Sequence, residues 1–342
     1  MTSDRDVLLP AFSVSNIHIP EVLTKRKLAS ILAQVYDPHG LICPFISGVK
    51  VLLQDVWLKG LDWDEPLALD SFESGPETLQ NFKQAAATGK EVTLPRWVGV
   101  LNSGDAQLHI FCDSSRRLYA DCAYLRVNSP RGICCSLIAA KSRLITPKLL
   151  EVKFGPKFEL LACYLAVKLS KSILSAFAIV GSLSVFCWTD SLICLNWIRG
   201  NAYQHDIFVR NRLLFIKSSN YSWGYVPTDQ NPADIPTRGT LPLGYLWWSG
   251  PSWLSQGESD WPSSSLCSKG DASLLVADVS SVNKAGMAYD NDVVNPKRVS
   301  RWRKLVRSFA WLAKIFNKSS SFKPGEVSVE EEAGAELIVL RQ

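Results

Sequence analysis

Four carboxylates in the middle of the chain have the types and positions that a two-metal nuclease requires. Asp113, Glu159 and Asp190 each adjoin an apolar run, and Asp234 follows the turn Asn231-Pro232-Ala233. Each acid is therefore expected where a buried element meets a polar surface. If the four converge, their oxygens can hold the hard divalent cations that promote phosphodiester cleavage. The leading hypothesis is a phosphodiester-cleaving enzyme.

Each acid also has a purely structural interpretation. Asp113 could open a turn with the two serines that follow it, and Glu159 could be a first-turn carboxylate favoured by the helix dipole. Asp190 and Asp234 could each cap the helix that follows. Four such coincidences in one chain are a weaker explanation than a shared site.

The positive charge of the chain is concentrated around these acids. The 342 residues suggest two or three domains, and 47% hydrophobic residues with 12 Trp provide ample material for a core. Residues 1–105 carry 9 Lys and Arg against 13 Asp and Glu, and residues 245–342 carry 12 against 11. Residues 106–244 carry 16 against 8, as expected if a polyanion approaches an acidic metal site. Ordinary surface lysine and arginine are the alternative.

The cysteines and the apolar runs indicate an intracellular protein, cytoplasmic or nuclear. The nine cysteines form no Cys-x-x-Cys pair and lie mostly in apolar runs, as reduced core thiols do, and no zinc site is expected. The N-terminus has no signal-peptide pattern. The uncharged stretch 173–188 is short for a bilayer span and is broken by Gly181-Ser182. We therefore expect no membrane segment, and no small-molecule cofactor either.

The first hundred residues are predicted to form a helical subdomain without chemistry of its own. Apolar residues recur at helical spacing in 25–36, 46–58 and 76–88. The turn Asp37-Pro38-His39-Gly40 separates the first two helices, and the acidic stretch 62–75 is loop-like.

From residue 105 the pattern changes to that of an α/β fold, a mixed sheet flanked by helices. The element order is β-β-β-α-β-α-α-β-α. The expected strands are 108–113, 119–127, 133–140, 183–189 and 221–226, and the expected helices are 158–174, 191–199, 206–217 and one starting near Asp234.

The C-terminal third is predicted to hold a linker and one amphipathic helix. Residues 255–292 are rich in Ser, Gly and Asp, as linkers are. Residues 301–317 place Trp302, Leu305, Phe309 and Phe316 on one side and basic residues on the other. We expect this helix to pack on a neighbouring domain rather than on a membrane.

Several short motifs occur in a fixed order along the chain. They are Lys27-Leu28-Ala29-Ser30-Ile31, Tyr36-Asp37-Pro38-His39-Gly40-Leu41, Trp188-Thr189-Asp190-Ser191, Val226-Pro227-Thr228 with Asn231-Pro232-Ala233-Asp234, and Leu246-Trp247-Trp248 with Gly250-Pro251. Together they resemble the BEL/Pao retrotransposon polyprotein, including the segment often labelled Pao retrotransposon peptidase. The resemblance implies four regions. They are a reverse transcriptase thumb/connection-like region at 1–100, a ribonuclease H-like domain at 105–245, a linker at 246–295 and the helical start of an integrase-like region at 296–342.

The resemblance also implies roles for the acids. Asp113 would bridge two Mg²⁺ ions, with Mn²⁺ as an alternative, that lie about 4 Å apart. Asp234 would help to hold the ion that activates water, and Glu159 and Asp190 would hold the ion at the leaving group. The implied substrate is the RNA strand of an RNA–DNA hybrid, and other segments of the polyprotein are the implied partners. Candidates for a basic track along the nucleic acid are Arg116, Lys141, Arg143, Arg210, Arg212 and Arg238.

The missing polymerase core and the departures from the family pattern around Ala120 favour an alternative, a non-catalytic relic that binds nucleic acid or protein. Ala120-Asp121 stands where the family has Gly and a small apolar residue. Gly155-Pro156-Lys157 replaces a β-branched residue, Pro and Arg, and Trp223-Gly224 lacks the following Arg. An aspartic peptidase is a further alternative, but Asp113-Ser114-Ser115 lacks the glycine of its motif. No Tyr-x-Asp-Asp polymerase motif occurs.

Overall fold

The computed structural model describes residues 7–8, 20–35, 37–72, 75–88, 94–95, 106–129, 132–151, 155–176, 183–239 and 243–262. The chain divides into two compact units, Met1–Leu275 and Val276–Gln342, and every described residue lies in the first. The amphipathic helix predicted at 301–317 lies outside the described residues.

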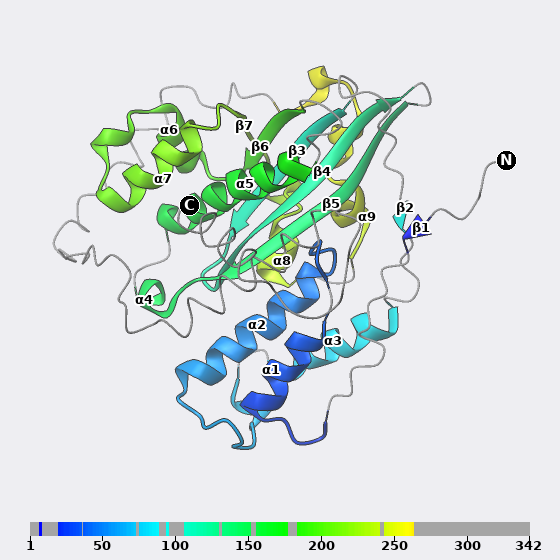
Figure 1. Ribbon diagram of the computed structural model, residues 1–342, viewed down its shortest axis with the longest axis vertical. Coiled ribbons are helices and arrows are strands. Elements are labelled where there is room, and N and C mark those ends of the chain that lie inside the picture. The colour runs from blue at the N-terminus through cyan, green and yellow to red at the C-terminus, as the bar shows by residue number, and fades with distance from the viewer. Residues whose placement is uncertain are drawn as a thin grey trace, which may run out of the picture. The chain divides into compact units, whose positions relative to one another are not determined.

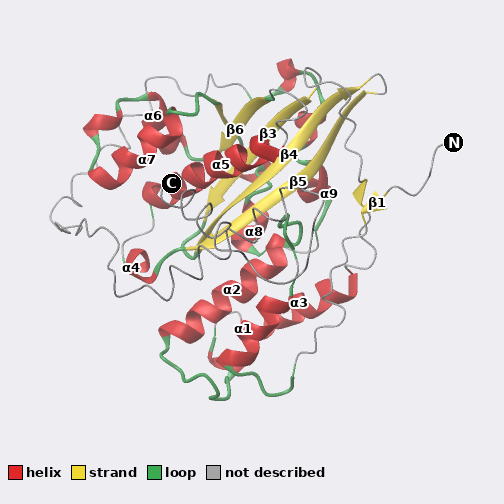
Figure 2. Ribbon diagram, viewed as in Figure 1, coloured by secondary structure: helices red, strands yellow, loops and turns green. Residues whose placement is uncertain are grey.

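A five-stranded mixed sheet forms the centre of the described fold (Figures 1 and 2). Its strand order is β5-β4-β3-β6-β7. The strands β3 (Ala106–Ser114), β4 (Leu118–Ser129) and β5 (Gly132–Leu144) form an antiparallel meander. The strands β6 (Ser184–Thr189) and β7 (Ser222–Tyr225) run parallel to β3. The predicted α/β class is confirmed. The short strands β1 (Val7–Leu8) and β2 (Leu94–Pro95) pair separately.

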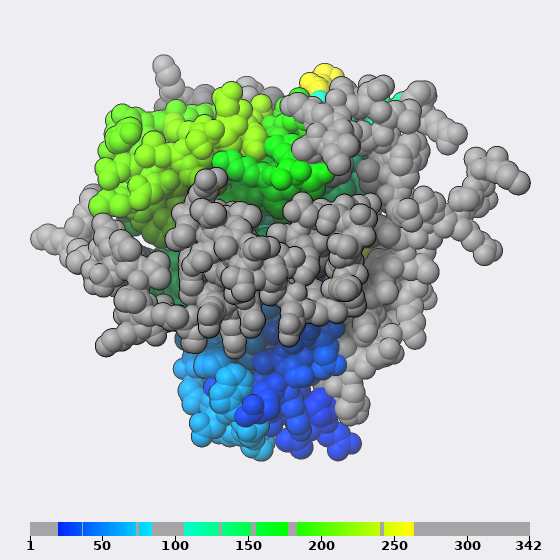
Figure 3. Space-filling model, in the orientation of Figure 1, coloured from blue at the N-terminus to red at the C-terminus, as the bar shows by residue number. Residues whose placement is uncertain are grey.

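One face of the sheet is aliphatic and packs against the helix α5 (Pro156–Ala176). Because side chains alternate along a strand, Leu108, Ile110 and Cys112 of β3 point to this face and contact the apolar side of α5. The helices α6 (Leu192–Arg199) and α7 (Ile207–Lys217) complete this layer, whose surface is the green region in the upper part of Figure 3. The layer fixes the first turn of α5 near the end of β3.

The opposite face of the sheet is aromatic. Phe111 and Trp188 are buried there and contact Trp253, whose ring centroid is 4.8 Å from that of Trp188. His109 is also buried and accepts a 3.1 Å hydrogen bond from the Trp188 indole. The covering elements are α8 (Asp234–Arg238), α9 (Tyr245–Ser249) and the 3₁₀ turns at 252–255 and 258–260.

This cover corrects the predicted start of the linker. Trp247, Trp253 and Leu254 are fully or nearly fully buried against the sheet. The Tyr124 hydroxyl donates to the carbonyl of Trp247 at 2.7 Å, and Arg126 donates to that of Leu254 at 2.9 Å. Residues 246–254 are therefore part of the core, because large apolar side chains there complete the aromatic face. Residues 263–295 lie outside the described residues, and the linker predicted there stays a prediction.

The N-terminal helices dock on the edge strand of the sheet through the Asp-Pro-His-Gly turn. The helices are α1 (Lys25–Gln34), α2 (Cys43–Leu58) and α3 (Gly75–Thr88), with a 3₁₀ turn at 69–71. Asp37 accepts the backbone N–H of residues 41 and 42, which lead into α2. The carbonyl of His39 accepts the N–H of Ala140 in β5 at 2.7 Å. Gly40 has φ +74°, and a Cβ there would lie 1.8 Å from the carbonyl oxygen of Ala140. The turn thus requires glycine for close contact between two backbones.

The predicted elements match the observed ones with small shifts at their ends. The second N-terminal helix starts at Cys43 rather than at 46, and the third predicted strand continues to Leu144 rather than ending at 140. The sequence did not predict the short helix α4 (Pro147–Leu150) or the 3₁₀ turns at 202–204 and 228–230. Within the uncharged stretch 173–188, the described residues end α5 and form most of β6. Among the described helices, none is long and apolar enough to cross a membrane.

Candidate active site

The carboxylates of Asp113, Glu159 and Asp190 meet at one edge of the sheet. Asp113 is the penultimate residue of β3, and Asp190 directly follows β6, the parallel neighbour of β3. Parallel neighbours bring their carboxyl ends to the same edge. Glu159 lies in the first turn of α5, which crosses above that edge. One carboxylate oxygen from each of the three lies within 4.8 Å of the others.

Asp234 joins these acids from α8. It lies in the first turn of that helix, and its charge acts on Asp113. The preceding Asn231 positions the helix: its side-chain amide donates to the carbonyl of Cys112 at 3.2 Å and accepts the N–H of Ala233 at 3.1 Å. We call Asp113, Glu159, Asp190 and Asp234 the acid cluster.

Burial and mutual repulsion disfavour the ionised forms of these acids. Burial and the charges of Glu159 and Asp234 raise the pKa of Asp113 to about 9. Burial and the charge of Asp190 raise the pKa of Glu159 to about 8. Burial also raises the pKa values of Asp190 and Asp234, although hydrogen bonds and the Arg238 guanidinium oppose the rise. In the absence of a cation, the cluster therefore retains protons at neutral pH.

Neighbouring donors hold three of the four acids in place. The Thr237 hydroxyl donates to Oδ2 of Asp113. The Thr228 hydroxyl donates to Oδ2 of Asp190 at 2.9 Å, and Arg238 pairs with Asp234 at 3.1 Å. Thr228, Thr237 and Asn231 were not predicted from the sequence as site residues. Their signal was present, since Thr228 and Asn231 belong to the motifs around Asp234 and Thr237 lies one helical turn beyond it.

Of the purely structural roles considered for the four acids, only the first-turn position of Glu159 is observed. Ser191, not Asp190, caps α6, because its hydroxyl accepts the N–H of Cys194. The residue before Asp234 is the N-cap of α8, so Asp234 is not a cap either. Asp113 lies inside β3, and the hydroxyl of Ser115 holds the turn that follows. Glu159 does lie in a helical first turn, where the dipole favours a carboxylate, but it points at other acids.

The donor set fits divalent cations. Three carboxylate oxygens at mutual distances of at most 4.8 Å are hard ligands of the type that Mg²⁺ and Mn²⁺ take. Oε2 of Glu159 and Oδ1 of Asp234 are buried without a hydrogen-bond partner. A buried unpartnered carboxylate oxygen is costly, and a cation would satisfy it. Asp113, Glu159 and Asp190 are therefore the residues that would hold metal here. Asp234 is not among the three acids that meet within 4.8 Å, but its buried Oδ1 would gain a partner if a cation bound beside it.

The six basic residues proposed for nucleic-acid contact lie in three places. Arg116 follows β3, and Arg238 ends α8 beside the acid cluster. Lys141 and Arg143 lie on the edge strand β5. Arg210 and Arg212 lie on α7, where the Arg212 guanidinium packs 3.4 Å from the centroid of the Phe208 ring.

The departures from the family pattern have different surroundings: two face the core and one forms an ion pair at the surface. Asp121 is 0% exposed, and neither of its carboxylate oxygens has a hydrogen-bond partner. A Cβ on Gly224 would lie 2.5 Å from the Trp188 ring, so the aromatic face requires glycine there. Lys157 pairs with Asp206 at 2.7 Å and thereby ties α5 to the start of α7.

Comparison with protein families gives one match. Residues 24–191, just under half of the chain, match the model of the Pao retrotransposon-like RNaseH-like domain. The resemblance inferred from the motifs is confirmed over that range. The range starts at Thr24, which caps α1, and includes Asp113, Glu159 and Asp190 but not Asp234. Comparison with curated proteins finds no match.

Among solved structures, the chain is similar to two of the foamy viral protease-reverse transcriptase. One, in complex with RNA/DNA hybrid, is 14% identical with a TM-score of 0.37 over 63% of this chain and 26% of that one. The other, termed dRH and in complex with ds DNA, is 13% identical with a TM-score of 0.37 over 63% and 34%. The chain thus spans about a third or less of these proteins. The N-terminal RNase H domain of rv2228c from Mycobacterium tuberculosis, fused to maltose binding protein, is 12% identical with a TM-score of 0.27 over 39% and 94%.

Proposed function

We propose that this chain is a ribonuclease H that hydrolyses the RNA strand of RNA–DNA hybrids with Mg²⁺. The match of residues 24–191 to the Pao retrotransposon-like RNaseH-like domain supports this proposal. The convergence of acids from β3, α5 and β6 on one edge of the sheet is the observation that carries the proposal. These acids come from positions 113, 159 and 190, so that only the tertiary fold brings them together.

Two divalent ions held by the acid cluster would supply the positive charge that lowers the pKa of an attacking water and stabilises the leaving oxygen. The chain's own residues set the geometry. The hydroxyls of Thr237 and Thr228 fix one oxygen each of Asp113 and Asp190, which leaves the other oxygens free to ligate. Arg238 holds Asp234 near the cluster and limits its repulsion by the other acids.

The surrounding charge supports a polyanionic substrate. Residues 106–244 have twice as many basic as acidic residues, and phosphate contacts dominate nucleic-acid affinity. Arg116, Lys141, Arg143, Arg210, Arg212 and Arg238 are the proposed backbone contacts. Selection of the RNA strand would depend on contacts to its 2′-hydroxyls.

The direct test is cleavage of an end-labelled RNA–DNA hybrid by the purified full chain, with Mg²⁺ or with EDTA. We expect Mg²⁺-dependent cleavage that falls about 10³-fold or more in Asp113→Asn and Asp190→Asn, with folding retained. Asp229→Asn is the matched control, because Asp229 is exposed and close in sequence to the cluster but not part of it. Undiminished Mg²⁺-dependent cleavage in both cluster variants would defeat the proposal.

One observation favours a second candidate, a relic that binds nucleic acid or a polyprotein partner without cutting. Asp121 places an unpartnered carboxyl in the core, where the family has a small apolar residue, and such a change is typical of relaxed constraint on stability. A gel shift with hybrid but no cleavage in Mg²⁺ or Mn²⁺ would favour this candidate. Under either function, the proposed partners include other segments of the retrotransposon polyprotein.

A further inference from the structure

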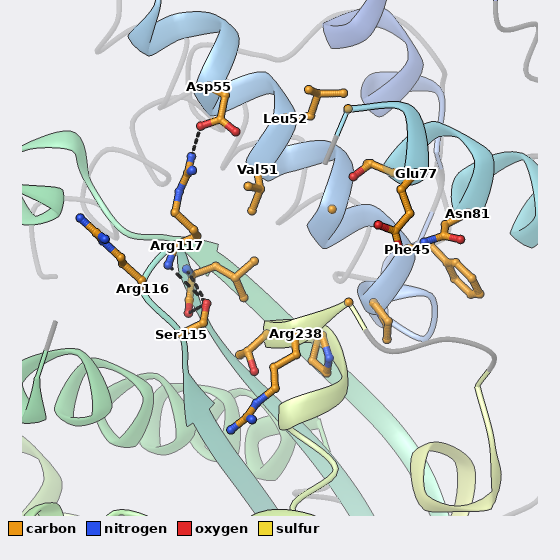
Figure 4. A pocket seen from close by; sticks show the side chains of 18 residues that line it. Phe45, Val51, Leu52, Asp55, Glu77, Asn81, Ser115, Arg116, Arg117 and Arg238 are labelled. Carbon is orange, nitrogen blue, oxygen red and sulfur yellow. Dashed lines mark hydrogen bonds and ion pairs between the residues drawn. The ribbon is translucent and has the colours of Figure 1, made fainter. Parts of the chain in front are cut away.

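A cavity separates the N-terminal helices from the turn that follows β3 (Figure 4). Its volume is about 340 Å³. One wall comes from α2 and α3, and the other comes from the β3–β4 turn and α8. The cavity thus lies between the N-terminal helices and the sheet domain, and α8 connects it to the acid cluster.

The two walls differ in chemistry. On the helical side, Phe45, Val51 and Leu52 offer aromatic and aliphatic surface, and Asn81 offers an amide (Figure 4). Glu77 of the same wall carries a carboxylate. Arg116 and Arg238, both exposed, belong to the opposite wall, and their guanidinium groups point away from the helices (Figure 4). A ligand with a flat apolar part inside the cavity and an anionic part outside it, toward the two arginines, matches this division.

Arg117 closes one end of the cavity and is not available to a ligand. Its guanidinium donates to Oε1 of Gln54 at 3.0 Å and pairs with Asp55. These contacts tie the β3–β4 turn to α2, and Gln54 also donates to the carbonyl of Ile145 at 2.7 Å. The cavity therefore has a fixed wall rather than a loop that could fold into it.

The cavity and the acid cluster share α8. Thr237 lines the cavity and donates to Asp113, and Arg238 lines the cavity and pairs with Asp234. A strand whose phosphodiester lies at the acids would therefore pass close to Thr237 and Arg238, which also line the cavity.

From these observations we infer that the cavity holds one unpaired nucleotide of the strand bound at the acid cluster, its base between Phe45 and the aliphatic residues and its phosphate at Arg116 and Arg238. The inference rests on the proposed function for the location of the strand. Unpaired bases are recognised by stacking on aromatic and guanidinium planes together with hydrogen bonds to their edges, which Asn81 can supply. About 340 Å³ lies at the lower end of the range of small-ligand sites, enough for one base and sugar but not for a base pair.

The test compares two RNA–DNA hybrids of equal length, one fully paired and one with a single unpaired nucleotide in the RNA strand. Fluorescence anisotropy with the wild-type full chain in Ca²⁺ measures binding without relying on turnover. We expect the unpaired nucleotide to tighten binding about tenfold, the size of one base–aromatic stacking contact. Equal dissociation constants for the two hybrids would overturn the inference, whatever the cleavage assay gives.

Filling the cavity should remove the preference for the hybrid with an unpaired nucleotide and leave the affinity for the paired hybrid nearly unchanged. Val51→Trp places an indole in the cavity from the α2 wall, and Asn81→Trp does so from α3. We expect both variants to bind the two hybrids equally, with affinity for the paired hybrid within about twofold of wild type. Val22→Trp is the matched control, because Val22 is 53% exposed and outside the cavity. If both filling variants are folded and keep the full preference, the nucleotide binds elsewhere and the inference fails.

The cavity and nuclease hypotheses fail separately. A wild-type chain that prefers the unpaired nucleotide but does not cleave in Mg²⁺ would retain the cavity site and lose the proposed function. A chain that cleaves the paired hybrid without the preference would keep the function and lose the cavity site.

Discussion

The acid cluster and the single carboxyl of Asp121 differ in their surroundings, although Asp113 of the cluster and Asp121 are buried in neighbouring strands of one sheet. In the acid cluster, three carboxylates from separate elements lie within 4.8 Å, and threonine hydroxyls fix two of them. Asp121, in the middle of β4, is alone on the α5 face, fully buried, with no hydrogen-bond partner for either oxygen. Burial raises the pKa in both places.

The difference shows that burial and a raised pKa do not by themselves identify a functional acid. Asp121 is opposite Lys141 of β5, and the charges of Lys141 and Arg143 only partly offset its burial. In the acid cluster, like charges add to burial for Asp113, a cost that a bound cation would remove. Convergence of several acids at an accessible edge is therefore the feature that indicates metal chemistry.

The largest expected effect is on cleavage. Glu159→Gln removes a charge from the cluster and is expected to reduce Mg²⁺-dependent cleavage of hybrid about 10³-fold, because the neutral amide is a poorer metal ligand. Asp121→Asn makes the same chemical change outside the cluster and should leave the rate within about threefold. Single-turnover rates of the two variants give the comparison. Equal losses in both would mean that convergence does not distinguish the two regions.

The second largest expected effect is on the melting temperature, as a function of pH and of bound Mg²⁺. The pKa values of about 9 for Asp113 and about 8 for Glu159 lie above those of the unfolded chain, near 4, so the native state holds protons that the unfolded chain has released. Stability contributed by these groups is complete below about pH 4 and is lost as pH rises toward about 9. In EDTA we therefore expect the melting temperature to fall across this range, and Mg²⁺ to reduce the fall.

Thermal melts at a series of pH values, with EDTA and with Mg²⁺, measure this dependence. Asp113→Asn should flatten the EDTA curve, since it removes the group with the larger rise in pKa. A melting temperature that rises with pH in EDTA, or that Mg²⁺ does not change, would contradict the expected linkage.

The smallest effect is on stability at Asp121. Asp121→Ala removes two buried oxygens without partners and should increase the free energy of unfolding by about 1–3 kcal/mol at neutral pH. Urea denaturation measures the change, with Ala123→Ser as a control that adds a polar group to the same strand and face and should destabilise. A loss of stability in Asp121→Ala would show that the carboxyl contributes favourable contacts, for example with Lys141.

Local sequence signals predicted most of the fold. Helical spacing identified α2, α5 and α7, and β-prone runs separated by polar turns identified the meander of β3 to β5. The ends shifted by a few residues, because contacts with distant parts of the chain extend or shorten an element. The start of the linker at 246 was wrong for the same reason, since burial of Trp247 and Trp253 depends on contacts with β4 and β3, more than 100 residues earlier in the sequence.

The sequence by itself determined the residue types, the elements that carry them and the resemblance to a retrotransposon family, because periodicity, turn chemistry and motif order are properties of neighbouring residues. Only the tertiary structure decided which side chains meet. The parallel pairing of β3 with β6 joined Asp113 to Asp190, and the packing of α8 on the sheet gave Asp113 its partner Thr237. The packing of α5 on the other face of the sheet buried Asp121, and the docking of α2 and α3 left the cavity beside Arg238. These outcomes depend on strand register and on layers packed across large sequence separations, which no local pattern encodes.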